Sequence, residues 1–258
     1  MKRRKFFQYA GLSALSTALI GTSTLARSSQ AQSTGSVTVQ WLGHTCFLFS
    51  GDGRRILVNP FRTLGCTADY RTPNVVANLV MISSRLLDEG VVEGLPGNPR
   101  ILSEPGVYEF SNMQVQGIAT PHDLNQGRRF GTNVVWRWTQ GGVNLLHLGG
   151  AAAPIMLEEQ ILIGRPDVVF IPVGGGVKAY NAEQARQAID VLNPKIIVPT
   201  HYRTAAADPD SCDIAGLEEF LALMDGVPIT RRSTDSISFS RASLPETGQK
   251  IEVFNYRF

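Results

Sequence analysis

The sequence has few cysteines and histidines, no long apolar run and no large excess of charge. Its 258 residues include three cysteines and four histidines, and 18% of the residues are charged. No Cys-x-x-Cys pair, zinc-finger spacing or internal repeat is present. A mildly apolar stretch, residues 10–25, is short and interrupted by Ser and Thr, which makes it a poor membrane span. With 43% hydrophobic residues, the composition is that of an ordinary globular protein.

The first 31 residues have the features of an export signal. A basic start is followed by a weakly apolar stretch and by Ser29-Gln30-Ala31, a small-x-small cleavage site. Arg3-Arg4 followed by Lys5-Phe6-Phe7 resembles a twin-arginine signal. We expect cleavage after Ala31, a mature domain of residues 32–258, and delivery by the export machinery to the periplasm or a comparable extracytoplasmic lumen. A general secretory signal or an uncleaved anchor is the alternative.

The net charge limits the classes of partner that the mature chain can have, and the cysteines limit its disulfide chemistry. The signal carries five basic residues and no acid, so the net charge of +2 becomes negative once it is removed. No basic patch then remains to indicate nucleic-acid binding. Cys46, Cys66 and Cys212 allow one disulfide and one free thiol, and the sequence does not assign the pair. Cys46 lies in an apolar strand pattern, which favours a small buried hydrophobe.

Secondary-structure patterns divide the mature chain into a strand-rich first half and an alternating second half. Short β-rich runs are separated by turns, and Gln140-Gly141-Gly142 predicts a hairpin. Helices are predicted over 155–164, over 182–192 with Asn181 as cap, and over 214–224, before a final strand pair, "SISFS" and "IEVFNY". We expect one α/β domain of two packed mixed sheets flanked by helices.

Polar residues gather where predicted strands end. His122, His147 and His201 close or follow strands, and Asp88 with Glu89 follows the apolar run "NLVMIS". Strand ends converge at one rim of a sheet, so these residues are candidates for a common site. His44 precedes its strand, and we interpret it as structural or, at most, as a neighbour of the site.

Several segments, in order, resemble one family. They are "WLGHTCFLFSGDGRRILVNPF", "PHDLNQGRRFGTN", "HLGGAAAP" and "DVVFIPVGGGVKAYNAEQARQAIDVLNPKIIVPTHYRT". They are similar to the metallo-β-lactamase-fold hydrolases, in the branch that includes ascorbate-phosphate lactonase-like and zinc-dependent hydrolase proteins. The resemblance implies a four-layer αβ/βα sandwich of two mixed sheets, with the site at the sheet ends.

The family's metal motif is degenerate in this chain. The His-x-His-x-Asp-His turn after the fourth strand is replaced by "SRLLDE": Ser84 and Leu86 stand at the first two histidines, Asp88 is kept and Glu89 replaces the last histidine. Gly150 stands at the bridging aspartate and Asn59 at an early aspartate, whereas His122 and His201 match later histidine ligands. The resemblance therefore implies one lost metal position, which would have had Ser84, Leu86 and His122.

A second metal position remains possible by the same resemblance. Asp88, Glu89 and His201 would offer two carboxylates and an imidazole, enough for one zinc, manganese or iron ion. The favoured hypothesis is a non-catalytic binding or assembly protein with no cofactor and an unknown small-molecule or protein partner. The alternative is a mononuclear hydrolase of a small ester, lactone or phosphoester, with His122 beside the ligands or as proton shuttle.

Other patterns carry weaker hypotheses. Ser83 or Ser84 with His122 and Asp88 could form a hydrolytic triad, but no Gly-x-Ser-x-Gly elbow surrounds either serine. "PVGGGVK" lacks the spacing of a phosphate loop and is interpreted as a tight turn. Trp136 and Trp138 share one strand face and are expected in the core or a pocket wall. Arg128 and Arg129 are candidate anion-binding residues, although a solvated or salt-bridged turn is favoured.

Overall fold

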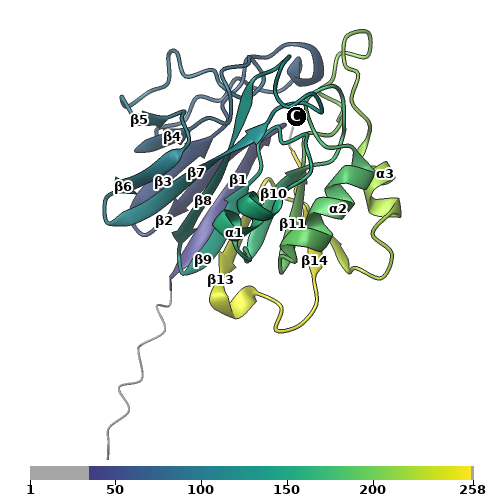
Figure 1. Ribbon diagram of the computed structural model, residues 1–258. Coiled ribbons are helices and arrows are strands. Elements are labelled where there is room, and N and C mark those ends of the chain that lie inside the picture. Colours follow the sequence, from purple (N-terminus) through teal and green to yellow (C-terminus); the bar gives the residue numbers. More distant parts are fainter. Residues whose placement is uncertain (1–34, 257–258) are drawn as a thin grey trace, which may run out of the picture. The chain divides into compact units, whose positions relative to one another are not determined.

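The computed structural model describes residues 35–256, and these residues form two mixed β-sheets (Figure 1). The signal predicted for residues 1–31 lies outside the described residues. The six-stranded sheet has the order β13-β1-β2-β3-β4-β5, and the eight-stranded sheet has the order β12-β14-β11-β10-β9-β8-β7-β6. The expected pair of mixed sheets is confirmed.

Each sheet is antiparallel in one part and parallel in the other. The strands of the six-stranded sheet are β1 (Ser36–Gly43), β2 (Cys46–Gly51), β3 (Arg54–Val58), β4 (Leu79–Met81), β5 (Arg100–Leu102) and β13 (Ser236–Ser240). Those of the eight-stranded sheet are β6 (Gly106–Phe110), β7 (Met113–Pro121), β8 (Thr132–Gln140), β9 (Val143–His147), β10 (Val168–Pro172), β11 (Ile196–Thr200), β12 (Ile229–Arg231) and β14 (Lys250–Val253). Strands β3, β4 and β5 run parallel, as do β9, β10, β11, β14 and β12.

Aromatic side chains pack the two sheets against each other. Phe49 of β2 meets Trp138 of β8 with ring centroids 4.9 Å apart and Phe170 of β10 at 5.1 Å. Trp136 and Trp138 are both buried in this core, as expected from their shared strand face. The core therefore runs between the sheets, which leaves the rim at the strand ends for a site.

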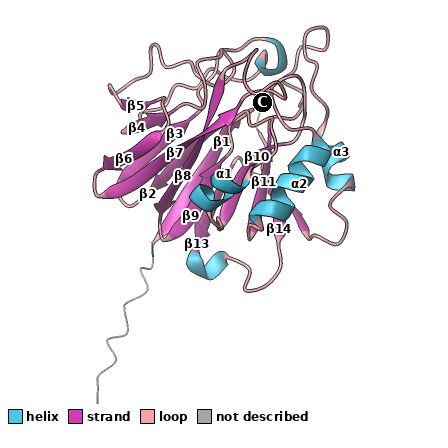
Figure 2. Cartoon of the chain, viewed as in Figure 1, coloured by secondary structure: helices cyan, strands magenta, loops and turns pink. Residues whose placement is uncertain are grey.

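Helical cover is thin in the described part of the chain. It consists of α1 (Leu157–Ile163), α2 (Ala182–Leu192), α3 (Leu217–Ala222) and two 3₁₀ turns, η1 (Gly65–Thr67) and η2 (Arg241–Ser243). Figure 2 shows the three α-helices together, beside the half of the molecule that holds β10, β11 and β14. Among the described residues no helix has the length and hydrophobicity needed to cross a bilayer.

Local signals predicted α2 and one hairpin well. The Asn181 side chain accepts a hydrogen bond from Gln184 N at 2.9 Å, and Gln184 Oε1 accepts one from Asn181 N at 3.0 Å. This reciprocal cap fixes the start of α2 at the predicted residue. Gly141 and Gly142, with φ of 59° and 75°, form the two-residue turn between β8 and β9. Helices α1 and α3 are shorter than predicted.

The predicted final strand pair is wrong. "SISFS" is β13 and pairs with β1 at the edge of the six-stranded sheet. The next strand, β14, lies between β11 and β12 in the eight-stranded sheet. Neighbouring strands in sequence usually pair, but here β13 forms an edge of the six-stranded sheet, whereas β14 is an inner strand of the eight-stranded sheet.

Cys66 and Cys212 form a disulfide across 146 residues, and Cys46 is the buried free thiol among the described residues. The bridge joins η1 to the segment that follows β11. Backbone hydrogen bonds reinforce it, from Asp69 N to Ala206 O at 2.9 Å and from Asp208 N to Gly65 O at 3.0 Å. Two segments far apart in sequence are thereby tied together at the rim where β3 and β11 end.

Candidate functional site

Three side chains with metal-ligating atoms meet at the rim of the two sheets. His44 lies in the turn between β1 and β2, Asp88 in the loop after β4, and His201 directly after β11. One ligand atom of each side chain lies within 4.8 Å of the other two. The rings of His44 and His201 are 4.4 Å apart at their centroids. The site thus joins both sheets, because β1 and β4 belong to one and β11 to the other.

His44, which was expected to be structural or at most a neighbour of the site, is a member of this cluster. It sits with Thr45 in a two-residue hairpin, since Gly43 pairs with Cys46. Although His44 precedes β2, it also follows β1 directly. The apolar strand pattern before "GHT" was the signal that could have placed it at a strand end with the others.

Left-handed backbone positions mark this region. His44, Asn59 and His201 have φ of 53°, 52° and 50°. Asn and His adopt this conformation more readily than most residues, yet it remains uncommon outside glycine. Such positions persist where the surrounding structure holds them and are concentrated at functional sites. Here the left-handed backbone of His44 and of His201 directs each imidazole toward the rim, at the ends of β1 and β11.

Burial and neighbouring groups set the protonation states of Asp88 and His201. Burial by itself raises the pKa of Asp88, but His44 and Lys178 outweigh that effect and hold the pKa well below its usual range. Burial lowers the pKa of His201 well below its usual value, and nearby His44 lowers it further. The cluster therefore combines a carboxylate with a neutral imidazole, the protonation states that a metal ion requires.

Lys178 also enters this cluster. Its Nζ forms an ion pair with Asp88 Oδ2, and the same oxygen lies 3.7 Å from His44 Nε2. Lys178 belongs to the turn after β10, in which Gly175 and Gly176 have φ of 77° and 83°. The glycines of "PVGGGVK" therefore serve a tight turn, as expected.

Glu89 points away from Asp88 and into a second, fully buried cluster. Its Oε1 lies 3.1 Å from His122 Nε2 and accepts a hydrogen bond from Ser84 Oγ at 2.6 Å. Its Oε2 accepts a longer one, 3.4 Å, from Asn59 Nδ2. The structure thus separates Glu89 from the predicted set of Asp88, Glu89 and His201, and it brings His44 there instead.

The positions that the resemblance marked as degenerate surround this second cluster. Ser84 and Asn59 hold Glu89, and half-buried Leu86 has no donor atom to offer. At Gly150 a Cβ would lie 2.3 Å from His122 Nε2 and 3.2 Å from Glu89 Oε1. The ring of His122 fills the space in which an aspartate side chain would have to begin.

His122, predicted to lie beside the ligands or to move protons, is fully buried and does not line the cavity next to the three ligands. A serine triad finds no support in the geometry. Ser83 Oγ has no hydrogen-bond partner among the described residues, and Ser84 Oγ donates to Glu89 rather than to His122. Neither Ser83 nor Ser84 is therefore placed for activation by an imidazole.

His147 has a structural role. Its Nε2 hydrogen bonds to Thr45 O at 3.0 Å, and its Nδ1 accepts from Gly149 N at 3.1 Å. Burial lowers the pKa of His147 to about 3, so the ring is neutral. Both nitrogens are used, which leaves no lone pair for a ligand.

The candidate anion-binding arginines lie in a loop organised by Asp123. This carboxylate accepts hydrogen bonds from the backbone N–H groups of Asn125, Gly127, Arg129 and Phe130. Arg128 and Arg129 are exposed, and the Arg129 guanidinium lies 4.8 Å from the centroid of the Phe130 ring. Neither arginine lines the cavity beside His44, Asp88 and His201.

A cavity of about 140 Å³ opens beside the three ligands. The cavity is lined by these ligands and by Lys178. Residues on both sides of the disulfide also line it: Leu64, Cys66 and Thr67 on one side, and Asp213 and Ile214 on the other. A wider depression of about 450 Å³ adjoins it at Leu64 and Asp88. Leu64, Leu87 and Val177 around the opening are exposed by 63%, 46% and 52%. The site therefore has a charged floor and an apolar rim.

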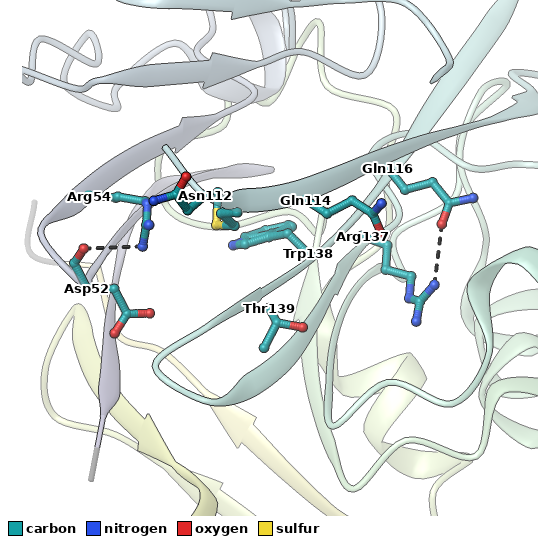
Figure 3. A pocket seen from close by; sticks show the side chains of 9 residues that line it. Asp52, Arg54, Asn112, Gln114, Gln116, Arg137, Trp138 and Thr139 are labelled. Carbon is teal, nitrogen blue, oxygen red and sulfur yellow. Dashed lines mark hydrogen bonds between the residues drawn. The ribbon is translucent and has the colours of Figure 1, made fainter. Parts of the chain in front are cut away.

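A separate cavity of about 340 Å³ lies over β7 and β8 (Figure 3). Its lining contains no histidine or cysteine. Two arginines in it are already engaged, Arg54 with Asp52 O and Arg137 with Gln116 Oε1. It is larger than the cavity of about 140 Å³ at the rim, but its lining brings together no cluster of metal-ligating side chains, so we place the candidate site at the rim.

The donor set tests whether a metal ion fits. His44 has no hydrogen-bond partner at either ring nitrogen, and His201 has none at Nδ1, although these atoms are buried. Unpaired buried imidazole nitrogens are costly unless a ligand satisfies them. Two imidazoles and a carboxylate are a known set for zinc or iron. One ion therefore fits at His44, Asp88 and His201, whereas the cluster of Glu89 and His122 does not supply three ligands.

Two facing mixed sheets with a histidine and carboxylate cluster at their rim define the class of metallo-β-lactamase-fold proteins. The chain belongs to the beta-lactamase superfamily domain family, whose model matches residues 38–201. It is 23% identical over 200 residues to a UPF0173 metal-dependent hydrolase of Thermoplasma acidophilum, covering 66% of this chain and 86% of the relative. A UPF0173 metal-dependent hydrolase of Methanoculleus marisnigri is 26% identical over 236 residues, or 83% and 95% of the two chains.

A solved structure supports the same assignment. A proposed Zn-dependent hydrolase of the metallo-beta-lactamase superfamily from Thermotoga maritima superposes with a TM-score of 0.66 and 26% identity. The alignment covers 84% of this chain and 98% of that one. The predicted fold and family are thereby confirmed.

Proposed function

We propose that the protein is a hydrolase built around a single divalent metal ion, held by His44, Asp88 and His201. The observation that carries the proposal is the convergence of these ligand atoms within 4.8 Å of one another, with no hydrogen-bond partner at either nitrogen of His44 or at Nδ1 of His201. When bound, such an ion acts as a Lewis acid on a substrate carbonyl or phosphoryl oxygen. Related proteins named metal-dependent hydrolases support this class of activity.

The chain's own residues would shape substrate choice. The cavity of about 140 Å³ admits only a small reacting group next to the ligands. The exposed rim of Leu64, Leu87 and Val177 offers apolar contact to the remainder of the substrate. A small ester, lactone or phosphoester with an apolar portion fits this arrangement.

Export is part of the proposal. The basic and small-residue pattern of residues 1–31 supports a twin-arginine signal. The Cys66–Cys212 disulfide supports an oxidising compartment, since such bonds are rare in reducing cytosol. We therefore place the working protein in the periplasm or a similar lumen.

The test combines metal content with hydrolysis. Protein from cells supplied with zinc, manganese and iron should contain about one ion per chain by elemental analysis. His44→Ala and Asp88→Asn should each abolish binding and hydrolysis of model esters, lactones and phosphoesters. Glu89→Gln is the matched control, because it alters the adjacent carboxylate outside the ligand set and should keep the ion. Loss of metal in Glu89→Gln but not in His44→Ala would refute the assignment.

A non-catalytic binding protein is the second candidate. The ion pair between Lys178 and Asp88 favours it, because a cation of the chain already engages the carboxylate. Gly150 and the buried pair of Glu89 and His122 also leave only one metal position, where the family motif has two. Folded protein that acquires no metal and hydrolyses none of the model substrates would support this candidate.

A further inference from the structure

Lys178 and a metal ion need the same atom. Lys178 Nζ pairs with Asp88 Oδ2, the oxygen that also lies nearest His44 Nε2 at 3.7 Å. Lys178 lines the same cavity as all three ligands. Its side chain is 21% exposed, so the ammonium is only partly screened by water. The site thus has its own cation, supplied by the turn after β10.

We propose that Lys178 is an intramolecular competitor of the divalent ion for Asp88. The lysine ammonium and the ion are alternative partners of one carboxylate, and metal binds only when Lys178 withdraws. The inference rests on the proposed function for the place of the ion, but not for any hydrolytic step. Lys178 would then set the affinity of the site for divalent metal ions and its selectivity among them.

Electrostatics makes the two partners exclusive. An ammonium and a divalent cation on the same oxygen repel each other strongly in a partly buried site, where water screens them little. The ammonium offers only hydrogen-bond donors, and these engage the same oxygen lone pairs of Asp88 that an ion would use. While Lys178 holds Asp88, the donor set lacks its one negative charge.

The structure also provides a place for the displaced lysine. Asp213 lines the same cavity, is exposed and has no ion-pair partner among the described residues. Its carboxylate oxygens lie 3.9 and 4.0 Å from the point where a side chain at Gly176 would place its Cβ. Gly176 is two residues before Lys178. A flexible four-carbon stem can transfer the ammonium from Asp88 to Asp213 by side-chain rotation.

Competition lowers apparent metal affinity by the fraction of molecules in which Asp88 is available. Replacing Lys178 by an uncharged residue of similar length removes that factor. Lys178→Met should therefore bind Zn²⁺ and Mn²⁺ at least about tenfold more tightly than the native protein. Lys178→Arg keeps the charge and should bind no more tightly than the native protein.

The experiment is calorimetric titration of the full purified protein with Zn²⁺ and with Mn²⁺, after dialysis against a chelator. Lys195→Met is the matched control: Lys195 pairs with Asp167 at 3.6 Å before β11, at the opposite end of that strand from His201. The Lys195→Met variant should bind both metal ions with the affinity of the native protein. Lys178→Gln provides a second uncharged variant, and circular dichroism confirms that each variant is folded.

Each outcome decides the inference separately from the proposed function. Tighter binding in Lys178→Met and Lys178→Gln supports it, including the case in which only these variants bind metal and the native protein is inactive. Equal or weaker affinity in both variants overturns it, even if the native protein is a metal-dependent hydrolase. Absence of metal binding in all the proteins overturns it as well, because the lysine would not be what excludes the ion.

Discussion

Glu89 Oε1 lies 3.1 Å from His122 Nε2, and both side chains are almost entirely buried. The carboxylate also holds Ser84 and Asn59, so it connects the ends of β3 and β4 with the end of β7. The space that a bridging aspartate at position 150 would need is filled by this pair. An internal contact of imidazole with carboxylate therefore stands where the family motif would place metal ligands.

Removing this carboxylate should strongly destabilise the fold. Glu89→Ala leaves His122 without its carboxylate and the Ser84 hydroxyl without its acceptor in a buried site, and we expect the free energy of unfolding to fall by about 3–5 kcal/mol. Glu89→Gln keeps hydrogen bonding to Ser84 and should cost less. Guanidinium denaturation of the three proteins measures both effects. Near-native stability of Glu89→Ala would mean that the cluster contributes little.

The disulfide should stabilise the protein and respond to reductant. Cys66–Cys212 closes a long loop between η1 and the segment after β11. Replacing both cysteines by serine should lower the free energy of unfolding by about 2–4 kcal/mol, because the unfolded chain gains freedom. The native protein should lose a similar amount in dithiothreitol, whereas the double variant should not respond. Cys46→Ala is the control, since Cys46 lies outside the bridge.

Stability should fall in mild acid because of His147. Burial lowers the pKa of His147 to about 3, whereas an unfolded chain has the ordinary histidine value of about 6.5. Between these values the unfolded state binds a proton that the folded state does not, so stability decreases as pH falls, by up to about 1.4 kcal/mol per pH unit. Burial of His201 acts in the same direction.

The contribution of His147 can be isolated with His147→Gln, whose amide can still donate and accept. Denaturation at several pH values between about 6.5 and 3 should give a shallower dependence for this variant than for the native protein. Equal slopes would show that His147 titrates normally in the folded protein. The comparison uses slopes, so a uniform loss of stability in the variant does not affect it.

Asp123 should control the mobility of the loop that carries Arg128 and Arg129. Four backbone N–H groups donate to its carboxylate, and these hydrogen bonds lower the pKa of Asp123 against the opposing effect of burial. Asp123→Ala should speed hydrogen exchange at residues 125–130, measured by mass spectrometry. Arg128→Ala is the control and should leave exchange unchanged. Unaltered exchange in Asp123→Ala would show that the loop is held by other contacts.

Local pattern predicted much of the fold because the signals involved are local. The reciprocal contacts of Asn181 and Gln184 fix the start of α2, and paired glycines at 141 and 142 fix a hairpin. The alternation around Trp136 and Trp138 marked a strand with one face in the core. The strands β13 and β14 were misassigned as partners, because a strand pattern does not encode which sheet a strand joins.

The sequence by itself determined that Leu86 and Gly150 bring no side-chain donor atom to the positions where the resemblance implies metal ligands. Tertiary structure decided the rest of the site. Asp88 and Glu89 are adjacent in the chain, yet one faces His44 and His201 and the other faces His122. His44 and Lys178 reach the same carboxylate from distant segments, and Cys66 finds Cys212 across 146 residues. These contacts depend on how two sheets bring their strand ends to one rim, and spacing along the chain does not contain that information.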